Sequence, residues 1–544
     1  MKKLITISIM LAIFGLSNLV NAQTPDWAWA KSAGGTDDDR GKSVCTDVSG
    51  NVFMAGNFRS PTITFGTTTL TNAGCYDIFI AKYDATGNVL WAKSAGGTSC
   101  DYGKSVCTDV SGNVFMAGNF ISPTITFGTT TLTNASCYDI FIAKYDATGN
   151  VLWAKSAGGG TLCDYVNSVA TDASGNAFIT GTFSSPTITF GTTTLIKADS
   201  GFSDIFIVKY DASGNVLWAR GAGGNGGTGR DVGNSVATDA NGNAFMTGSF
   251  DNPTITFGTI TLTHAGNNDI FIAKYDPSGN VLWAKSAVGT ADDRGNSVAT
   301  DASGNVFMTG DFHDTITFGT ITLTNAYFQN VFIVKYDANG NELWAKSSVG
   351  TGQFDQGSGV ATDASGNAFI TGTFTSTTIT FGSSTLTNRG LFIVKYDAGG
   401  NVLWAKSADD GFGSGVATDA SGNAFITGFF SSPTITFGSI TLTRAGNNDI
   451  FIAKLNGTTG IEEISSNNSI SIFPNPATSS FTLQLKAQVR DAEVAIYDVL
   501  GKEMMRNKMT GTSMEIEKGN MPSGVYFIKV WNNDWQRVEK IVVE

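Results

Sequence analysis

The stretch SVATDASGNAFITGTF, residues 168–183, decides the fold of this chain. It consists of two β-rich runs joined by Asp-x-x-Gly-Asn, in which the Asp side chain can bond the turn backbone and the Gly supplies a positive φ. The stretch therefore predicts a β-hairpin, and it recurs with a period of about 60 residues, in the range of propeller blades. The aspartates that open its turns are Asp47, Asp109, Asp172, Asp239, Asp301, Asp363 and Asp419.

A second stretch, DIFIAKYDATGNVLWAKS at residues 77–94, accompanies each copy, so each repeat is expected to supply four strands. The run IFIA at residues 78–81 is apolar on both faces and needs cover on both sides, which radially stacked blades provide. The small residues of the first strand suit the crowded position around a central channel. Between the second and third strands, PTITFGTTTLTN predicts a small extra hairpin that projects from the blade.

The two ends of the repeat array indicate a closed ring. The first three strands occur seven times, but the last copy of the third strand, residues 449–455, is followed by no fourth strand. A fourth-strand sequence at residues 26–31 precedes the first repeat, so we expect the N-terminus to complete the last blade and leave no unpaired edge. The predicted fold is all-β, with a seven-bladed β-propeller over residues 23–456 that is closed by an N-terminal strand.

The repeated pattern G-x-SVATD-xx-GN-xFxTG, followed by DIFIAKYD-xx-GN-xLW, resembles the secreted bacterial β-propeller repeats, or SBBP repeats, which are related to the NHL propellers. The resemblance covers about residues 26 to 456 and implies a fold without implying an activity. The recurring Trp of the fourth strand is expected to be buried between blades rather than to stack on sugars.

The N-terminus predicts export. Lys2 and Lys3 precede a short apolar run and a small-residue site, so we expect a signal peptide at residues 1–22, cleaved between Ala22 and Gln23. A retained membrane anchor is the weaker alternative, because the apolar run is short and no Cys follows the cleavage point. The formal net charge of −12 repels phosphate backbones and anionic lipid, which makes nucleic acid a poor partner.

A different pattern begins after a predicted linker at residues 457–468. Alternation of apolar and polar residues over 481–485, 494–497 and 525–530 predicts a small Ig-like β-sandwich at residues 469–544. The blocks IFPNP, YDVLG, MPSGVY and KIVV within it resemble a type IX secretion type A sorting domain of Bacteroidota. The motif residues are Pro474, Asn475, Pro476, Gly501, Pro522, Gly524 and Tyr526.

That resemblance implies passage through the type IX secretion machinery across the outer membrane. It also implies removal of the tail near the linker and its exchange for a surface lipopolysaccharide anchor. An ordinary Ig-like binding module is the alternative, since fold and function separate easily.

Six cysteines lie in the first three repeats. Cys45 and Cys107 take the place of an Ala in the first strand, where we expect small, inert, buried thiols. The other four lie in loops of the same blade face, and an oxidising compartment favours disulfides. We predict the pairs Cys75–Cys100 and Cys137–Cys163, with free or cross-paired thiols as the open alternatives.

The same face is the candidate ligand face. Acidic clusters in its loops, such as Asp37 to Asp39, are interpreted as solvated charge, with structural calcium as the alternative. A ring of polar residues precedes the first strand, which suits a ligand at the channel mouth and equally a water-filled channel. The candidate residues are Asp37, Asp38, Asp39, Lys42, Lys104, Asn167, Asn234, Asn296, Ser358 and Ser414.

Catalysis finds little support in the sequence. His264 and His313 each occur in a single repeat without a neighbouring Cys or carboxylate motif, and we predict no catalytic residue, cofactor or metal. The leading hypothesis is a non-enzymatic surface propeller that binds glycan or protein in adhesion or capture. A passive surface-layer or matrix protein is the second hypothesis. The third is a secreted hydrolase or lyase acting on polysaccharide through a carboxylate pair drawn from different blades.

Overall fold

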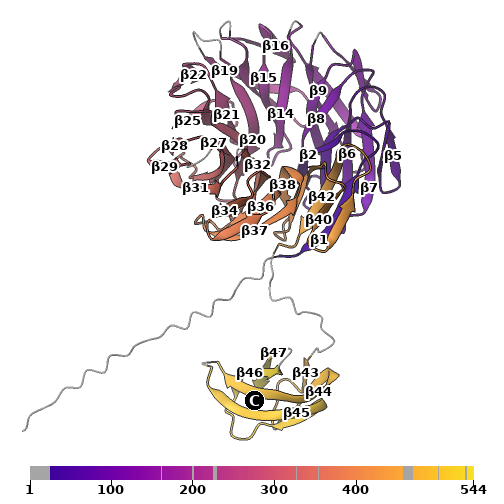
Figure 1. Cartoon of the computed structure of the whole chain (residues 1–544), viewed down its shortest axis with the longest axis vertical. Helices are drawn as coiled ribbons and strands as arrows, with labels where there is room; N and C mark the ends of the chain where they lie inside the picture. The colour runs from indigo at the N-terminus through magenta and orange to yellow at the C-terminus, as the bar shows by residue number, and fades with distance from the viewer. Residues whose placement is uncertain are drawn as a thin grey trace, which may run out of the picture. The chain divides into compact units, whose positions relative to one another are not determined.

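The chain divides into two compact units, Met1–Thr458 and Thr459–Glu544, and each is described by itself (Figure 1). The predicted signal peptide with its cleavage site at Ala22 and Gln23 lies outside the described residues, as does the predicted linker beyond residue 457. The computed structural model describes residues 25–135, 137–160, 162–198, 201–224, 229–325, 328–352, 354–457, 470–499, 501–532 and 536–544.

The first unit is built from repeated antiparallel sheets in the manner of a β-propeller, and its described residues contain no helix, so none of them forms a helix that could cross a membrane. Each repeat before the last supplies the four strands of one sheet, with the order β2-β3-β6-β7 in the first repeat. The innermost strands are β2 (Asp39–Thr46), β8 (Asp101–Thr108), β14 (Asp164–Thr171), β20 (Val232–Thr238), β26 (Arg294–Thr300), β32 (Asp355–Thr362) and β38 (Gly411–Thr418).

The two middle strands of each sheet are buried almost throughout. The second strands are β3 (Val52–Phe58), β9 (Val114–Phe120), β15 (Ala177–Phe183), β21 (Ala244–Phe250), β27 (Val306–Phe312), β33 (Ala368–Phe374) and β39 (Ala424–Phe430). The third strands are β6 (Asp77–Tyr83), β12 (Asp139–Tyr145), β18 (Asp204–Tyr210), β24 (Asp269–Tyr275), β30 (Asn330–Tyr336), β36 (Gly390–Tyr396) and β42 (Asp449–Leu455). The outer strands are β1 (Trp27–Ala33), β7 (Val89–Ala95), β13 (Val151–Ala157), β19 (Val216–Gly224), β25 (Val281–Gly289), β31 (Glu342–Gly350) and β37 (Val402–Asp409).

The Asp-x-x-Gly-Asn turns form as the sequence predicts. Asp47 and Asn51 pair through their backbones, and the Asp47 carboxylate accepts hydrogen bonds from the N–H groups of Ser49 and Asn51. Gly50 closes the turn with a φ of +78°, a value that favours glycine. The side-chain and backbone bonds of the aspartate together fix the register of each hairpin.

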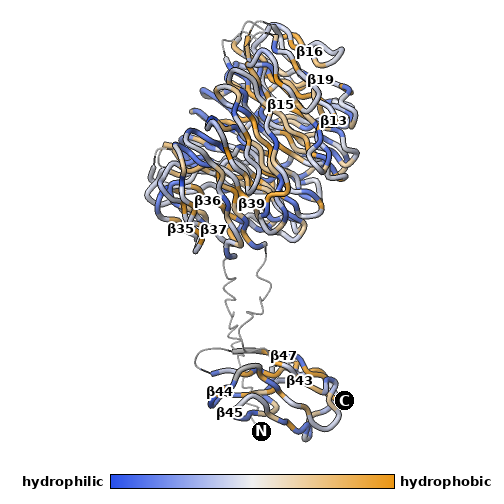
Figure 2. The backbone as a smooth tube through the Cα atoms, turned by 90° about the vertical axis from the view of Figure 1, so that its right-hand side faces the viewer, coloured by the Kyte–Doolittle hydropathy of each residue, from blue (hydrophilic) through white to orange (hydrophobic). Residues whose placement is uncertain are grey.

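The hydrophobic core lies between the sheets. Neighbouring residues of β3 point to opposite faces, so Met54 packs in one apolar cluster and Phe53 in the next. Hydrophobic stretches, coloured orange, follow the strands of the sheets (Figure 2). The expectation that both faces of these strands are covered is confirmed.

The ring closes through the N-terminal strand. β1 pairs antiparallel with β42, and the last sheet therefore has the order β1-β42-β39-β38. Innermost strands contact one another in sequence, and β38 contacts β2. A threonine hydroxyl of each innermost strand donates to a carbonyl of the preceding one, and Thr46 completes the circle by donating to the Thr418 carbonyl at 2.7 Å.

The extra hairpins do not project from the sheets as expected. Each lies between the outer strands of its own sheet and of the preceding sheet, and apolar side chains such as Ile63 and Phe65 are buried beneath it. Three of the hairpins extend that sheet by direct pairing, as β22 does with β19. The hairpins are β4 (Thr62–Phe65) with β5 (Thr68–Thr71), β10 (Thr124–Phe127) with β11 (Thr130–Thr133), β16 (Thr187–Phe190) with β17 (Thr193–Ile196), β22 (Thr254–Phe257) with β23 (Ile260–Thr263), β28 (Thr315–Phe318) with β29 (Ile321–Thr324), β34 (Thr378–Phe381) with β35 (Ser384–Thr387), and β40 (Thr434–Phe437) with β41 (Ile440–Thr443).

The second unit is one five-stranded antiparallel sheet folded over its own core. The long strand β44 pairs with β45 along most of its length, while β43 pairs with its first half and β46 with its second. Phe481 and Ile528, from two of these strands, meet in the core. The strands are β43 (Ile470–Phe473), β44 (Ser480–Asp498), β45 (Glu503–Glu517), β46 (Gly524–Trp531) and β47 (Gln536–Val543).

Candidate functional site

Asp39 is a loop anchor inside the first unit. It is fully buried, and its carboxylate accepts hydrogen bonds from the N–H groups of Gly35, Arg59 and Ser60. The Ser60 hydroxyl donates to the same carboxylate at 2.7 Å. Burial raises the pKa of Asp39, and these hydrogen bonds oppose the rise. Asp39 therefore does not belong to the ligand face expected from the sequence, because its carboxylate oxygens accept hydrogen bonds inside the fold.

Asp38 lies at the seam between the last and first sheets. Its carboxylate accepts hydrogen bonds from Arg40 Nε at 2.9 Å, the Tyr76 hydroxyl at 2.6 Å and Asn448 Nδ2 at 2.6 Å. Burial alone would raise the pKa of Asp38, but these three donors outweigh it and lower the pKa. Only 8% of Asp38 is exposed, so it acts first as a fixed support, whereas Asp37 beside it remains about one-third exposed.

The polar ring at the channel mouth has two chemically different parts. Its asparagines bridge neighbouring innermost strands: Asn167 donates to the Gly233 carbonyl at 2.9 Å. Asn234 and Asn296 repeat this bond on the next two strands, and Ser358 and Ser414 are half-buried. These asparagines hold the ring together, which the sequence did not reveal.

Lys42 and Lys104 replace the asparagines on the neighbouring strands β2 and β8. Among the described residues, neither ammonium group is recorded in a salt bridge. Burial lowers the pKa of Lys42 to about 8, aided by the charges of Lys104 and Arg40 and opposed by Asp38. Burial also lowers the pKa of Lys104. Two positive charges thus adjoin at one side of the mouth.

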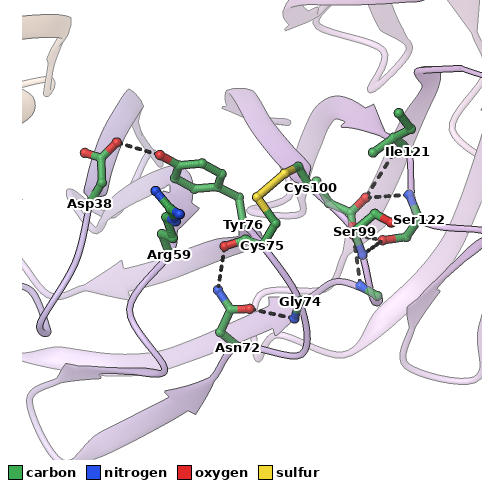
Figure 3. The surroundings of a disulfide bond; sticks show 12 residues. Asp38, Arg59, Asn72, Gly74, Cys75, Tyr76, Ser99, Cys100, Ile121 and Ser122 are labelled. Atoms are coloured by element: carbon green, nitrogen blue, oxygen red, sulfur yellow. Dashed lines mark hydrogen bonds between the residues drawn. A yellow bond between two sulfur atoms is a disulfide. The ribbon is translucent and has the colours of Figure 1, made fainter.

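Both predicted disulfides are confirmed. Cys75 pairs with Cys100, and Cys137 pairs with Cys163. Each joins the loop before a third strand to the loop before the next innermost strand, which places the two loop types on one face, as expected. The first disulfide lies directly beside Tyr76 (Figure 3).

A row of four tyrosines crosses the first three sheets on this face. The ring centroids of Tyr76 and Tyr102 lie 5.3 Å apart, those of Tyr102 and Tyr138 5.9 Å, and those of Tyr138 and Tyr165 5.5 Å. All four side chains are half-buried, so each ring is supported and still partly open to solvent. We call these four residues the tyrosine row.

The tyrosine row was not predicted from the sequence. Tyr76 and Tyr138 directly follow disulfide cysteines, while Tyr102 and Tyr165 stand two residues after the partner cysteines. This shared spacing was the available signal. The four tyrosines form one surface because the sheets place the alternating loops next to one another.

Cations border the tyrosine row. Lys104 Nζ lies 5.8 Å from the Tyr102 ring centroid, and the Arg59 guanidinium lies 5.9 Å from that of Tyr76. Beyond Asp38, Lys42 Nζ lies 5.8 Å from the ring centroid of Phe429. Aromatic faces attract cations within about 6 Å, so these positions are favourable for the lysines.

The opposite end of the channel is lined by fewer types of side chain. An open cavity of about 340 Å³ is lined by the Val, Ala and Thr residues at the ends of the innermost strands, together with Cys45 and Cys107. The two thiols are half-buried rather than fully buried, because they face this cavity. Burial raises the pKa of both thiols, which keeps them protonated and unreactive at neutral pH.

The tryptophans and histidines occupy supporting positions. Trp91 Nε1 donates to the Ala147 carbonyl of the next sheet at 3.2 Å, and Gly149 lies against its ring. Trp91 therefore packs between sheets, but it is half-buried rather than buried as expected. His264 and His313 bond to the backbone carbonyls of Asn267 and Asp292. Within the described ranges, no group of three or more His, Cys, Asp or Glu residues could hold a metal ion.

The predicted sorting residues build the second unit. Asn475 Nδ2 donates to the Lys540 carbonyl at 3.1 Å, and Asn475 Oδ1 accepts from the Val542 N–H at 2.9 Å. The Tyr526 hydroxyl donates to the Pro522 carbonyl at 2.8 Å. The remaining motif residues are Pro474 and Pro476 around Asn475, Gly501 in a turn with a φ of +82°, and Gly524 at the start of β46.

The C-terminal unit matches a known family. Residues 471–544 match the family described as a secretion system C-terminal sorting domain, which confirms the type IX sorting domain predicted from the motifs. The protein is therefore directed through the type IX secretion machinery across the outer membrane, to the cell surface or the extracellular space.

Three further proteins resemble the chain. An uncharacterized WD repeat-containing protein of Acanthamoeba polyphaga mimivirus is 27% identical over 508 residues, which cover 75% of this chain and 36% of the viral protein. An endo-acting ulvan lyase of Formosa agariphila is 35% identical over 75 residues, 14% of each chain. This chain therefore spans about a third or less of the length of either relative.

A solved structure of PorZ, a surface component of the type IX secretion system of Porphyromonas gingivalis, is 11% identical. The match covers 95% of this chain and 100% of PorZ, with a TM-score of 0.20. Because this score is low, the propeller-like fold is assigned from the strand pairing of the chain itself and not from the similarity to PorZ.

Proposed function

We propose that the first unit is a seven-bladed β-propeller, completed by β1, that binds a glycan outside the cell without catalysing a reaction. The second unit would be an Ig-like β-sandwich that is removed near the linker and exchanged for a lipopolysaccharide anchor. Binding at the cell surface would serve adhesion or capture. The observation that carries the proposal is the tyrosine row.

The row suits a sugar chain because tyrosine and pyranose rings are both amphipathic. A pyranose has an apolar C–H face and a polar rim, and a tyrosine offers an apolar ring with a hydroxyl at its edge. Tyrosine also brings a large rigid contact area at low cost in conformational entropy. Tyr102 and Tyr138, in the middle of the row, are each flanked by another tyrosine on both sides. A polymer could therefore contact several rings in succession.

A glycan fits this surface better than a protein partner. Stable protein interfaces bury about 800 Å² on each side, with an apolar centre. The tyrosine row is instead bordered by charged side chains, namely Asp37, Arg59 and Lys104. Binding of a protein by the same residues is an outcome that the experiment below would reveal.

The absence of catalysis is part of the proposal. A glycosidase needs two carboxyl groups placed on either side of the scissile bond. The Asp38 and Asp39 carboxyls are occupied by internal hydrogen bonds, and the aspartates that adjoin the four tyrosines in the sequence are buried. Turnover of labelled polysaccharides by the purified protein would contradict this part.

A glycan array probed with the full mature chain tests the function. Wild type is expected to bind at least one class of polysaccharide, and Tyr102→Ala or Tyr138→Ala should weaken that binding about tenfold or more. Phe328→Ala is the matched control, because Phe328 is a 64% exposed aromatic outside the row. Absence of any bound glycan, or equal loss in the control, would reject the proposal.

A further inference from the structure

The strongest unexplained feature of the first unit is the adjacent pair Lys42 and Lys104. At the same place on the following strands, Asn167, Asn234 and Asn296 bridge to the next strand. The lysines record no such bridge and add repulsion, since the charge of Lys104 helps to lower the pKa of Lys42. Two neighbouring positive charges cost stability unless an anion lies near them.

Other lysines of this unit show the usual arrangement. Lys82 and Lys144, in the third strands, lie 3.6 Å and 3.4 Å from Asp47 and Asp109, with nearly complete burial of all four side chains. The fold therefore supplies carboxylate partners where lysines serve structure. At the mouth, Lys42 and Lys104 also lie over aromatic rings, but no salt bridge to a described carboxylate is recorded for either.

We propose that Lys42 and Lys104 form a binding site for the carboxylate groups of an acidic polysaccharide whose sugar rings lie on the tyrosine row. Lys104 joins the two parts, because its ammonium group lies 5.8 Å from the ring centroid of Tyr102, the second member of the row. This inference rests on the proposed glycan binding and names the class of glycan.

The chemistry of the site favours a carboxylate that is bound by point charges rather than by planar paired donors. A lysine ammonium is a compact charge with three donors on a flexible stem, so a pair of them can follow a carboxylate at several angles. Arg40 and Arg59, which could offer planar paired donors, are already engaged by Asp38 and Asp37.

Matched polysaccharide pairs test the inference. Polygalacturonate, alginate and hyaluronan are each compared with the carboxyl-reduced form of the same polymer, using the full mature chain at low salt. At least one acidic form should bind ten times more tightly than its reduced counterpart. The double variant Lys42→Asn with Lys104→Asn should lose this preference and still bind the reduced form through the tyrosines.

The outcomes separate the two proposals. Equal binding of acidic and reduced forms by wild type would overturn the lysine site and leave glycan binding intact. A preference that survives in the double variant would also overturn it. Binding of neither form of any pair would reject both the acidic class and, together with a blank array, the glycan-binding function. Asparagine occurs at this ring position in three other repeats, so the variant is expected to fold.

Discussion

The Tyr76 hydroxyl donates a 2.6 Å hydrogen bond to the Asp38 carboxylate, although 38 residues separate them in the chain. The same carboxylate accepts a hydrogen bond from Asn448, just before the last strand of the ring. The first tyrosine of the row is therefore fixed to the seam at which the ring closes. Its ring orientation depends on the same contacts that join the last and first sheets.

Tyr76→Phe should test this link. Removing the hydroxyl leaves the ring in place but takes one donor from a nearly buried carboxylate, which should cost about 1 to 2 kcal/mol of unfolding free energy. Glycan binding should change by less than threefold, because the ring face remains. Denaturant titration measures the first effect, and Tyr165→Phe at the far end of the row is the control. An unchanged stability would show that the Asp38 contact contributes nothing.

Lys42→Asn should stabilise the protein in the absence of ligand. The Gly103 carbonyl occupies the place on β8 that the Gly233 carbonyl has for Asn167, so the new amide can form the same bridge. A bridge of this kind contributes about 1 kcal/mol, and removing one charge relieves the repulsion from Lys104. Thermal unfolding measures the change. A lower melting temperature would mean that Lys42 has a structural partner.

The contribution of three buried aspartates to the stability of the first unit should fall as pH rises from about 4 to about 8. Burial raises the pKa of Asp77 and of Asp231 to about 6, and burial with neighbouring carboxylates raises that of Asp293 to about 8. Because these folded-state values exceed the unfolded one, the folded chain holds protons that the unfolded chain has released. Their stabilisation is complete below about pH 4, and it is lost as pH rises to about 6 for Asp77 and Asp231 and to about 8 for Asp293.

Melting temperatures measured from pH 5 to pH 9 check this expectation. Asp293→Asn should flatten the decline between pH 6 and pH 8, because the amide does not titrate. Asp84 and Asp146 work in the opposite direction, since their turn hydrogen bonds lower their pKa to about 2 against a small effect of burial. They should favour unfolding only as pH falls below about 4. A melting temperature that rises steadily to pH 9 would contradict the assignment of the buried carboxyls.

The Cys75–Cys100 disulfide should stabilise both the fold and the tyrosine row. It closes a segment with a sequence separation of 25, and loss of such a crosslink costs about 3 kcal/mol. Cys75→Ser with Cys100→Ser should therefore lower the stability and weaken glycan binding, because Tyr76 and Tyr102 flank the bridge. Cys107→Ala is the control, since Ala stands at this position in other repeats. Binding unchanged in the double variant would show that the row needs no crosslink.

The repeat made most of the fold predictable. The turn motif fixed the hairpins, and the missing fourth strand after residue 455 located the partner of β1. Both disulfides also followed, because repeat alignment placed their cysteines in loops on one face. These features depend on local turn chemistry and on the number of strands in each repeat. A repeated sequence shows both many times.

The candidate site was harder to predict from the sequence because it depends on contacts between sheets. Asp39 resembled Asp37 and Asp38 in the sequence, yet its position at the start of β2 turns it inward to bind the loop. The ring asparagines looked free until Gly233 and its equivalents supplied acceptors on the next strand. The tyrosine row combines residues from loops more than 20 positions apart, so no single repeat contains it.

Titration calorimetry of the full mature chain with the strongest polysaccharide from the array tests the central claim most directly. The account predicts saturable binding to wild type and at least a hundredfold loss of affinity in Tyr102→Ala with Tyr138→Ala, while the melting temperature stays within a few degrees of wild type. Equal affinities for wild type and this double variant would contradict the claim that the tyrosine row is the glycan-binding surface.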